Sequence, residues 1–85
     1  MMSDYETIIL CAIRYALGRR TYIVSLVCGY VASQIDTLSA ECLSLIVRDI
    51  KNQEPWGYGD ECDKRDWVDL LSKINQCGRD IRGFD

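Results

Sequence analysis

Apolar residues recur every three to four positions in four separate stretches of this chain, and each stretch is bounded by residues that start or stop helices. This spacing places apolar side chains along one side of an α-helix, whereas a half-buried strand would alternate them with polar ones. With 85 residues, the chain can build one hydrophobic core but not two. We therefore expect an all-α fold, a compact single-domain bundle of about four short helices over residues 1–85.

The first two predicted helices meet at a glycine. Ser3–Glu6 matches a capping box, which starts a helix, and Gly18 provides the C-terminal stop of that helix. A second helix is expected from Tyr22 to about Gln34, although its β-branched and aromatic composition makes a strand the competing interpretation. The spacing of its apolar residues favours the helix. Its predicted core stripe consists of Ile23, Leu26, Val27, Tyr30 and Val31.

Two further helices are predicted in the second half of the chain. Ser39 caps the third helix, and Asp63 begins the fourth, which Gly78 stops. Between them, residues 52–61 form a linker because proline and glycine interrupt regular structure there. The third helix is expected to bury Cys42, Leu43, Leu45, Ile46 and Ile50. The fourth helix is expected to bury Trp67, Leu70, Leu71 and Ile74.

The overall charge is mildly negative, at −3 from 13 acidic and 10 basic residues. Proteins that bind duplex DNA usually present a strongly basic surface, so we expect no duplex DNA as a partner. A domain of this size has little stability to spare, and we therefore expect a homo-oligomer. Ser25, Gly29 and Ser33 share one side of the second helix, where we expect close packing inside the bundle rather than a separate dimer contact.

The five cysteines and the absence of histidine limit the chemistry available to this chain. No pair of cysteines has zinc-ligand spacing, and Cys11 and Cys28 lie inside apolar helical runs, which is typical of buried small side chains in a reducing compartment. We expect no metal, no cofactor and no disulfide framework. Because no apolar run has the length of a membrane span and no secretory signal precedes the first helix, we expect a cytoplasmic protein that does not enter membranes.

An acidic cluster precedes and enters the fourth helix, but it gives little support for catalysis. Asp60, Glu61, Asp63 and Asp66 supply carboxylates for acid–base chemistry or for a divalent cation. Acidic residues also favour a helix N-terminus for ordinary electrostatic reasons, and we prefer that interpretation. Cys62 lies between acidic neighbours, which disfavour its thiolate. We therefore expect no enzymatic activity.

Two adjacent arginines form the corner between the first two helices. Arg19 and Arg20 precede the start of the second helix, where unpaired backbone N–H groups and the helix dipole favour an anion. Paired guanidiniums beside such an end can hold a phosphate or a carboxylate. Thr21 adds a hydroxyl, Tyr22 adds a ring that can stack on a base, and Arg14 lies farther back along the first helix.

The same features also have an internal explanation. Arg19 and Arg20 can instead pair with the acidic residues near the fourth helix and tie the two regions together. Trp56 and Tyr58 can cap the small core or stack on a ligand, and Arg65 is a secondary ligand candidate. From the residues alone, both explanations stay open.

Two stretches, "IRYALGRRTYIV" and "GDECDKRDW", resemble a group of small, mostly uncharacterised proteins encoded by bacteriophages and prophages of Gram-positive bacteria. The resemblance spans the first helix, the corner and the start of the fourth helix. No activity comes with it, so no residue role is carried over. It implies a possible anti-defence protein, because small acidic phage proteins often interfere with host defence.

The leading functional expectation is a non-catalytic anti-defence protein that sequesters a nucleotide-derived immune signal at the arginine corner. The alternative is an anti-CRISPR-like protein–protein inhibitor of a host defence nuclease. In that case the important side chains would be Asp60, Glu61, Asp63, Asp66 and Asp69. A small phage transcription regulator ranks last, because the second helix is too apolar to present a DNA-recognition surface.

Overall fold

In this computed structural model, the described part of the chain comprises residues 2–19, 21–53 and 61–84. Its elements are α1 (Asp4–Ala16), α2 (Thr21–Ser33), the short 3-10 helix η1 (Ile35–Thr37), α3 (Ala40–Asn52) and α4 (Glu61–Asn75). No strand occurs among these residues. The predicted all-α fold is confirmed, although α4 begins at Glu61 rather than at Asp63.

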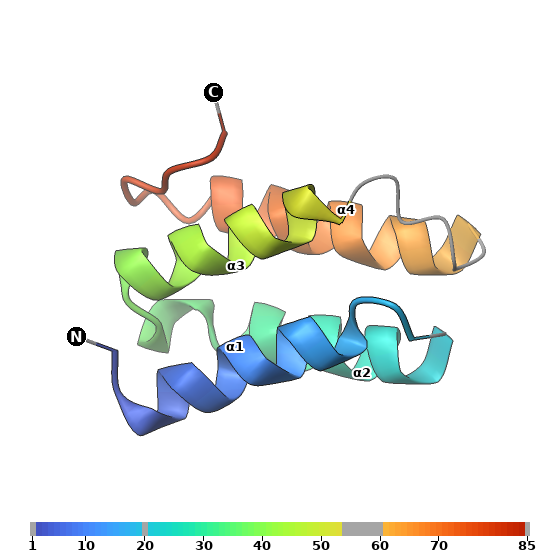
Figure 1. Cartoon of the computed structure of the whole chain (residues 1–85). Coiled ribbons are helices and arrows are strands. Elements are labelled where there is room, and N and C mark those ends of the chain that lie inside the picture. The colour runs from blue at the N-terminus through green and yellow to red at the C-terminus, as the bar shows by residue number, and fades with distance from the viewer. Residues whose placement is uncertain (1, 20, 54–60, 85) are drawn as a thin grey trace.

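The helices form two layers (Figure 1). The antiparallel pair α1 and α2 makes one layer, and α3 and α4 cover it. Helix α1 packs against α3, while α2 packs most extensively against α4. None of the described helices has both the length and the apolar character needed to cross a membrane.

The corner between α1 and α2 follows the predicted stop signal. Helix α1 ends at Ala16, Leu17 caps it in an extended conformation, and Gly18 adopts a φ of +94°. A positive φ of this size strains residues that carry a Cβ, so glycine suits the turn. The Arg19 N–H then donates to the Ala16 carbonyl at 2.9 Å, which closes the turn and directs the chain into α2.

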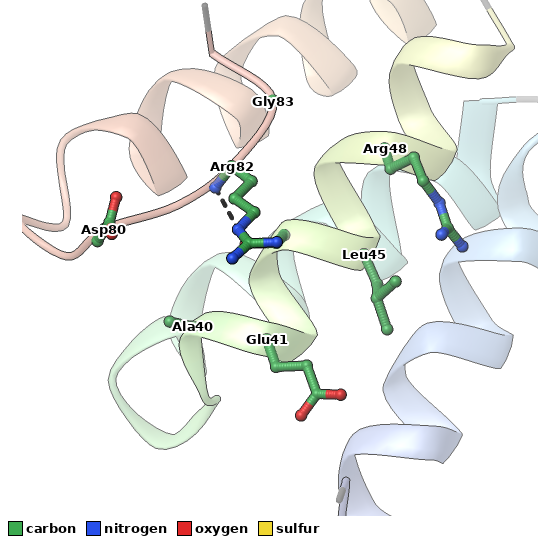
Figure 2. A pocket seen from close by; sticks show the side chains of 8 residues that line it. Ala40, Glu41, Leu45, Arg48, Asp80, Arg82 and Gly83 are labelled. Atoms are coloured by element: carbon green, nitrogen blue, oxygen red, sulfur yellow. Dashed lines mark hydrogen bonds between the residues drawn. The ribbon is translucent and has the colours of Figure 1, made fainter.

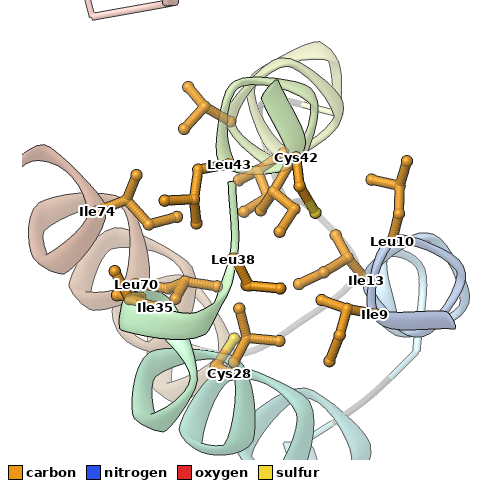
Figure 3. Packing of buried hydrophobic residues seen from close by; sticks show 14 of the residues in the cluster. Ile9, Leu10, Ile13, Cys28, Ile35, Leu38, Cys42, Leu43, Leu70 and Ile74 are labelled. Carbon is orange, nitrogen blue, oxygen red and sulfur yellow. The ribbon is translucent and has the colours of Figure 1, made fainter. Parts of the chain in front are cut away.

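Side chains from all four helices and from the α2–α3 connection fill the core (Figure 3). Leu38, from the segment between η1 and α3, is 1% exposed and lies among residues of several helices. Trp67, Leu70 and Ile74 of α4 are buried as predicted, while Leu71 is only partly buried. The core therefore joins the two layers, and each helix contributes one face to it.

The predicted core face of α2 is right only in part. Val31 is buried as predicted, and Ile23 and Val27 are partly buried against the core. Leu26 and Tyr30 are instead 56% and 52% exposed, and Val24 and Cys28 are the other buried side chains of this helix. Since α2 is apolar on nearly every side, its spacing alone could not select the face that packs on α4.

Two smaller burial predictions also need correction. On α3, Val47 is fully buried, whereas Leu45 is only partly buried. Among the cysteines, Cys28 and Cys42 are buried as small core side chains, but Cys11 is exposed. Helix α1 turns Cys11 away from the core because Ile9 and Ile13 occupy its buried face.

After α4, the tail of residues 76–84 returns along α3. The Arg79 guanidinium donates to the backbone carbonyls of Leu38 and Ile35, and the Arg82 N–H donates to Ser44 Oγ at 3.1 Å. Lys51 Nζ donates to the Gly83 carbonyl. Ile81 and Phe84 are partly buried and pack back onto the body of the protein. These contacts fix the tail as one wall of a groove beside α3.

Candidate ligand-binding site

Of the predicted arginines that the structure describes, Arg14 and Arg19 make different contacts. Arg14 Nε donates to Asp49 Oδ2 of α3 at 2.7 Å. This hydrogen bond and the charge of Asp49 raise the pKa of Arg14 above its ordinary value. The charge of Arg14 is thus paired with a carboxylate on α3, whereas Arg19 has a different partner.

Arg19 makes an aromatic contact instead. Its guanidinium carbon lies 4.6 Å from the centre of the Tyr15 ring, a distance that suits a cation–π interaction. Tyr15 is 57% exposed and Tyr22 is 75% exposed. The described part of the corner therefore presents the Arg19 cation and two open rings. Arg20 and the side chain of Thr21 lie outside the described residues, so the paired-guanidinium prediction stays a prediction.

The remaining sequence candidates lie elsewhere or outside the described structure. On α4, Arg65 and Asp69 are exposed and Asp66 is half-buried. The segment 54–60, which holds Trp56, Tyr58 and Asp60, is not described, nor are the side chains of Glu61 and Asp63. The proposed pairing of the corner arginines with these acidic residues therefore stays open.

A groove that the sequence did not reveal lies between α3 and the tail (Figure 2). It encloses about 650 Å³ and opens to solvent. Volumes of this size are typical of sites for small organic ligands. Its lining consists of Ala40, Glu41, Ser44, Leu45, Arg48, Asp80, Arg82 and Gly83.

Helical spacing on α3 builds one wall of this groove. Glu41, Ser44, Leu45 and Arg48 stand at relative positions i, i+3, i+4 and i+7, so they share one side of the helix. The tail makes the other wall, and its attachment to Ser44 uses the backbone N–H of Arg82. The guanidinium of Arg82 is therefore not the group that holds the tail in place. It reaches from the tail toward α3 (Figure 2).

The groove carries charges of both signs. Arg48 and Arg82 contribute guanidiniums, while Glu41 and Asp80 contribute carboxylates. Arg48 Nη2 lies 3.6 Å from Asp49 Oδ1, and the Arg48 side chain is 58% exposed, so solvent weakens this ion pair. Guanidiniums bind phosphates or carboxylates, the acidic groups accept hydrogen bonds from hydroxyls or amines, and Leu45 adds an apolar surface. The lining therefore suits a polyfunctional anion.

The buried Cys42 thiol has a strongly raised pKa. Burial raises the pKa of the Cys42 thiol to about 11, and the negative charges of Glu6 and Glu41 add to this effect. A thiol with such a pKa is a poor nucleophile near neutral pH. Within the described ranges, no three His, Cys, Asp or Glu side chains form a group that could hold a metal ion.

Sequence reasoning missed the groove because its two walls come from different parts of the chain. The stripe of Glu41, Ser44, Leu45 and Arg48 is visible in the sequence as a partly polar side of α3. That Arg82 lies opposite this stripe depends on the path of the tail, which the anchoring of Arg79 determines. No family model, no curated protein and no solved structure matches this chain.

Proposed function

We propose that this chain is a non-catalytic binding protein that sequesters a small nucleotide-derived anion in the groove between α3 and the tail. The observation that carries the proposal is that two guanidiniums, those of Arg48 and Arg82, line one groove of about 650 Å³. Arginine is the preferred side chain for bidentate contacts to phosphate. The groove thus has the charge and the size for a phosphorylated small molecule.

The acidic residues in the lining also support a nucleotide rather than a simple polyanion. Glu41 and Asp80 would repel additional phosphates, but they can accept hydrogen bonds from ribose hydroxyls or from amino groups of a base. Leu45 provides a surface against which a sugar or base can pack. The phosphate of the ligand would lie between Arg48 and Arg82, and its sugar or base would lie against the α3 wall.

The arginine corner is the second location for the same function. Arg19 and the open ring of Tyr22 could hold a phosphate and a base, respectively. A ligand there would rest on the exposed side of the α1–α2 turn and would bury less of its own surface than in the groove. Arg14 would contribute little because Asp49 already pairs with it. We therefore favour the groove.

The resemblance to phage proteins supports a role for such sequestration against host defence. A protein that holds an immune signal without altering it lowers the free concentration of that signal and prevents activation of its receptor. Catalysis is not required for this effect, which agrees with the raised pKa of Cys42 and with the absence of histidine.

Two alternatives have less support. An inhibitor of a defence nuclease would use a strongly acidic surface, and Asp66 and Asp69 on α4 are the described residues available for it. A transcription regulator would use α2 for DNA recognition, but the sequence from Thr21 to Ser33 contains no charged residue.

The proposal is tested by thermal shift and calorimetry with a panel of cyclic dinucleotides, cyclic ADP-ribose isomers, ADP-ribose, NAD and inorganic phosphate. At a concentration of about 100 times its Kd, a bound ligand adds about 2.7 kcal/mol to the free energy of unfolding. For a domain of this size, that raises Tm by about 10 °C or more. Recovery of the ligand unchanged after denaturing the complex would support the absence of catalysis.

Matched arginine variants locate the site. Arg48→Gln/Arg82→Gln should abolish the Tm shift, while Arg65→Gln, which removes an exposed arginine from α4, should retain it. Loss of the shift in Arg19→Gln alone would move the site to the corner. If no member of the panel raises Tm, the proposal of nucleotide sequestration is wrong.

A further inference from the structure

We propose that the outer face of the α1–α2 layer is an interface with a second copy of this chain. The outer face consists of Ile8 and Tyr15 on α1 and of Tyr22, Leu26 and Tyr30 on α2. This inference does not depend on the proposed ligand, because the groove lies on α3, in the other layer (Figure 1).

Helix geometry places these side chains on the same side of the molecule. On α2, Val24, Cys28 and Val31 point into the core, so Tyr22, Leu26 and Tyr30, at four-residue spacing, form a stripe on the side turned away from α4. On α1, Ile9 and Ile13 are buried, and Ile8 and Tyr15 lie on the opposite side at seven-residue spacing.

The two stripes run alongside each other because α1 and α2 are antiparallel neighbours (Figure 1). The Tyr5 hydroxyl donates to Gln34 Oε1 at 2.8 Å, just beyond the end of α2, and so marks the edge of α1 that faces α2. Ile8 and Tyr15 lie three and ten residues beyond Tyr5 and follow this edge. The two apolar stripes therefore belong to neighbouring helices of one layer.

The exposed area is close to what a stable dimer requires. Ile8, Tyr15, Tyr22, Leu26 and Tyr30 are 66%, 57%, 75%, 56% and 52% exposed. Large residues at these fractions leave roughly 100–200 Å² each, or about 700 Å² together. The largest apolar patch on a typical monomer is about 300–600 Å², and a standard interface buries about 800 Å² per partner. Neighbouring small residues on α2 can supply the remainder.

A second copy fits this face because α2 carries both halves of a complementary surface. The large side chains of Tyr22, Leu26 and Tyr30 project from α2, and the small residues Ser25, Gly29 and Ser33 lie beside them on the helix surface. These three small residues are exposed, so the expectation that they pack inside the bundle is wrong. A Cβ added at Gly29 would meet nothing within 4 Å, so α2 is uncovered there. In a two-fold antiparallel pairing of α2 with its copy, the large side chains of each helix can pack over the small residues of the other.

Charge also favours self-association at α2 over other faces. Each chain has a net charge of −3, so two copies repel one another, and a contact without charged groups adds no close like-charge pairs to this repulsion. Helix α2 has no charged residue from Thr21 to Ser33, and burying it therefore desolvates no charge on that helix. The Arg19 guanidinium, which stacks on the Tyr15 ring beside the outer face, can remain in water when two copies associate.

The test is the mass of the protein in solution, measured by sedimentation equilibrium over a wide concentration series. The wild-type chain should reach twice its 9.7 kDa mass. Leu26→Glu places a charge in the interface and should weaken the dimer by about 30-fold or more, as expected for a central interface residue. Val68→Glu is the matched control, because Val68 is 51% exposed on α4 and lies away from the outer face.

A second variant tests the same interface in case Leu26→Glu does not fold. Gly29→Met places a large side chain among the small residues of α2, its Cβ would meet nothing within 4 Å, and methionine suits a helix. It should preserve the circular dichroism spectrum and weaken the dimer. A wild-type chain that stays monomeric at every concentration would overturn the proposal and leave the face to a different protein partner. The proposal would also be overturned if Gly29→Met dimerised as tightly as the wild type. The same holds if Val68→Glu weakened the dimer as much as Leu26→Glu does.

Discussion

Glu6 of α1 and Ser39, the N-terminal cap of α3, are joined by a hydrogen bond from the Ser39 N–H to Glu6 Oε2 at 2.7 Å. The other carboxylate oxygen of Glu6 accepts the Ser3 N–H at 3.2 Å. One buried carboxylate thus satisfies backbone donors at the start of two helices that are far apart in sequence. It fixes the N-terminus of α1 against the N-terminus of α3.

We expect Glu6→Gln to destabilise the protein. The amide keeps the shape of the side chain but loses the negative charge that strengthens both hydrogen bonds. Hydrogen bonds to charged groups contribute about 1.5–3 kcal/mol, so the loss should be about 1–2 kcal/mol. Urea denaturation measures the difference. Asp69→Asn, which neutralises an exposed carboxylate on α4, should change stability by less than about 0.5 kcal/mol.

The same carboxylate should make stability depend on pH. Hydrogen bonds from the side chain and backbone of Ser39 lower the pKa of Glu6, although burial opposes them. A pKa lowered by folding gives stabilisation that is complete above the unfolded value, about 4.3, and is lost as the pH falls through the folded value. The stability difference between wild type and Glu6→Gln should therefore shrink from pH 6 toward pH 3. A constant difference would show that the charge of Glu6 is not responsible.

The capping signals made α1 and α3 predictable, because Ser3 and Ser39 act through residues within one helical turn. The face of α2 was not predictable. Val24 and Leu26 are similarly apolar, and only the packing of α2 on α4 decides that Val24 is buried and Leu26 exposed. Local chemistry therefore identified the helices, and tertiary contacts decided their orientation.

The candidate site shows the same limit. The sequence places Arg14 near Arg19, but the partner of Arg14 is Asp49, on a different helix. Conversely, Arg48 and Arg82 are distant in sequence and line one groove because the tail folds back along α3. Sequence spacing predicts neighbours on one helix, and it cannot predict neighbours that a long-range turn brings together.

Arg79 should anchor the tail. Its guanidinium donates to the carbonyls of Leu38 and Ile35, which precede α3. The Ile35 carbonyl also accepts the Leu38 N–H at 3.2 Å, so Arg79 binds the end of η1. Arg79→Ala should lower the free energy of unfolding by about 1–2 kcal/mol and loosen the tail. Arg79→Lys keeps the charge but lacks the planar guanidinium that donates to both carbonyls. It should therefore recover only part of the lost free energy of unfolding. Hydrogen exchange of the Arg82 amide, which donates to Ser44, reports the loosening directly. Unchanged exchange would contradict an anchoring role.

Gly83 should tolerate no side chain. Its φ is +106°, and an added Cβ would lie 2.9 Å from Val47 Cγ1. Gly83→Ala should therefore combine backbone strain with a clash against a buried residue and destabilise the protein by about 2–3 kcal/mol. Gly78→Ala separates the two effects, because Gly78 has a φ of +81° and nothing within 4 Å. It should lower stability by only about 1 kcal/mol. Equal losses in the two variants, measured by urea denaturation, would show that Val47 does not restrict the tail.

Cysteine labelling should distinguish the buried thiol of Cys42 from the exposed thiol of Cys11. Cys42 is 0% exposed and its pKa is raised to about 11, so at pH 8 only about one thiol in a thousand is ionised. Cys11 is exposed on α1. Brief treatment of the folded protein with iodoacetamide, followed by peptide mass spectrometry, should therefore modify Cys11 and leave Cys42 unmodified. In urea both should react at similar rates, because unfolding removes the burial that suppresses Cys42. Rapid modification of Cys42 in the folded protein would mean that the core between α1 and α3 opens readily.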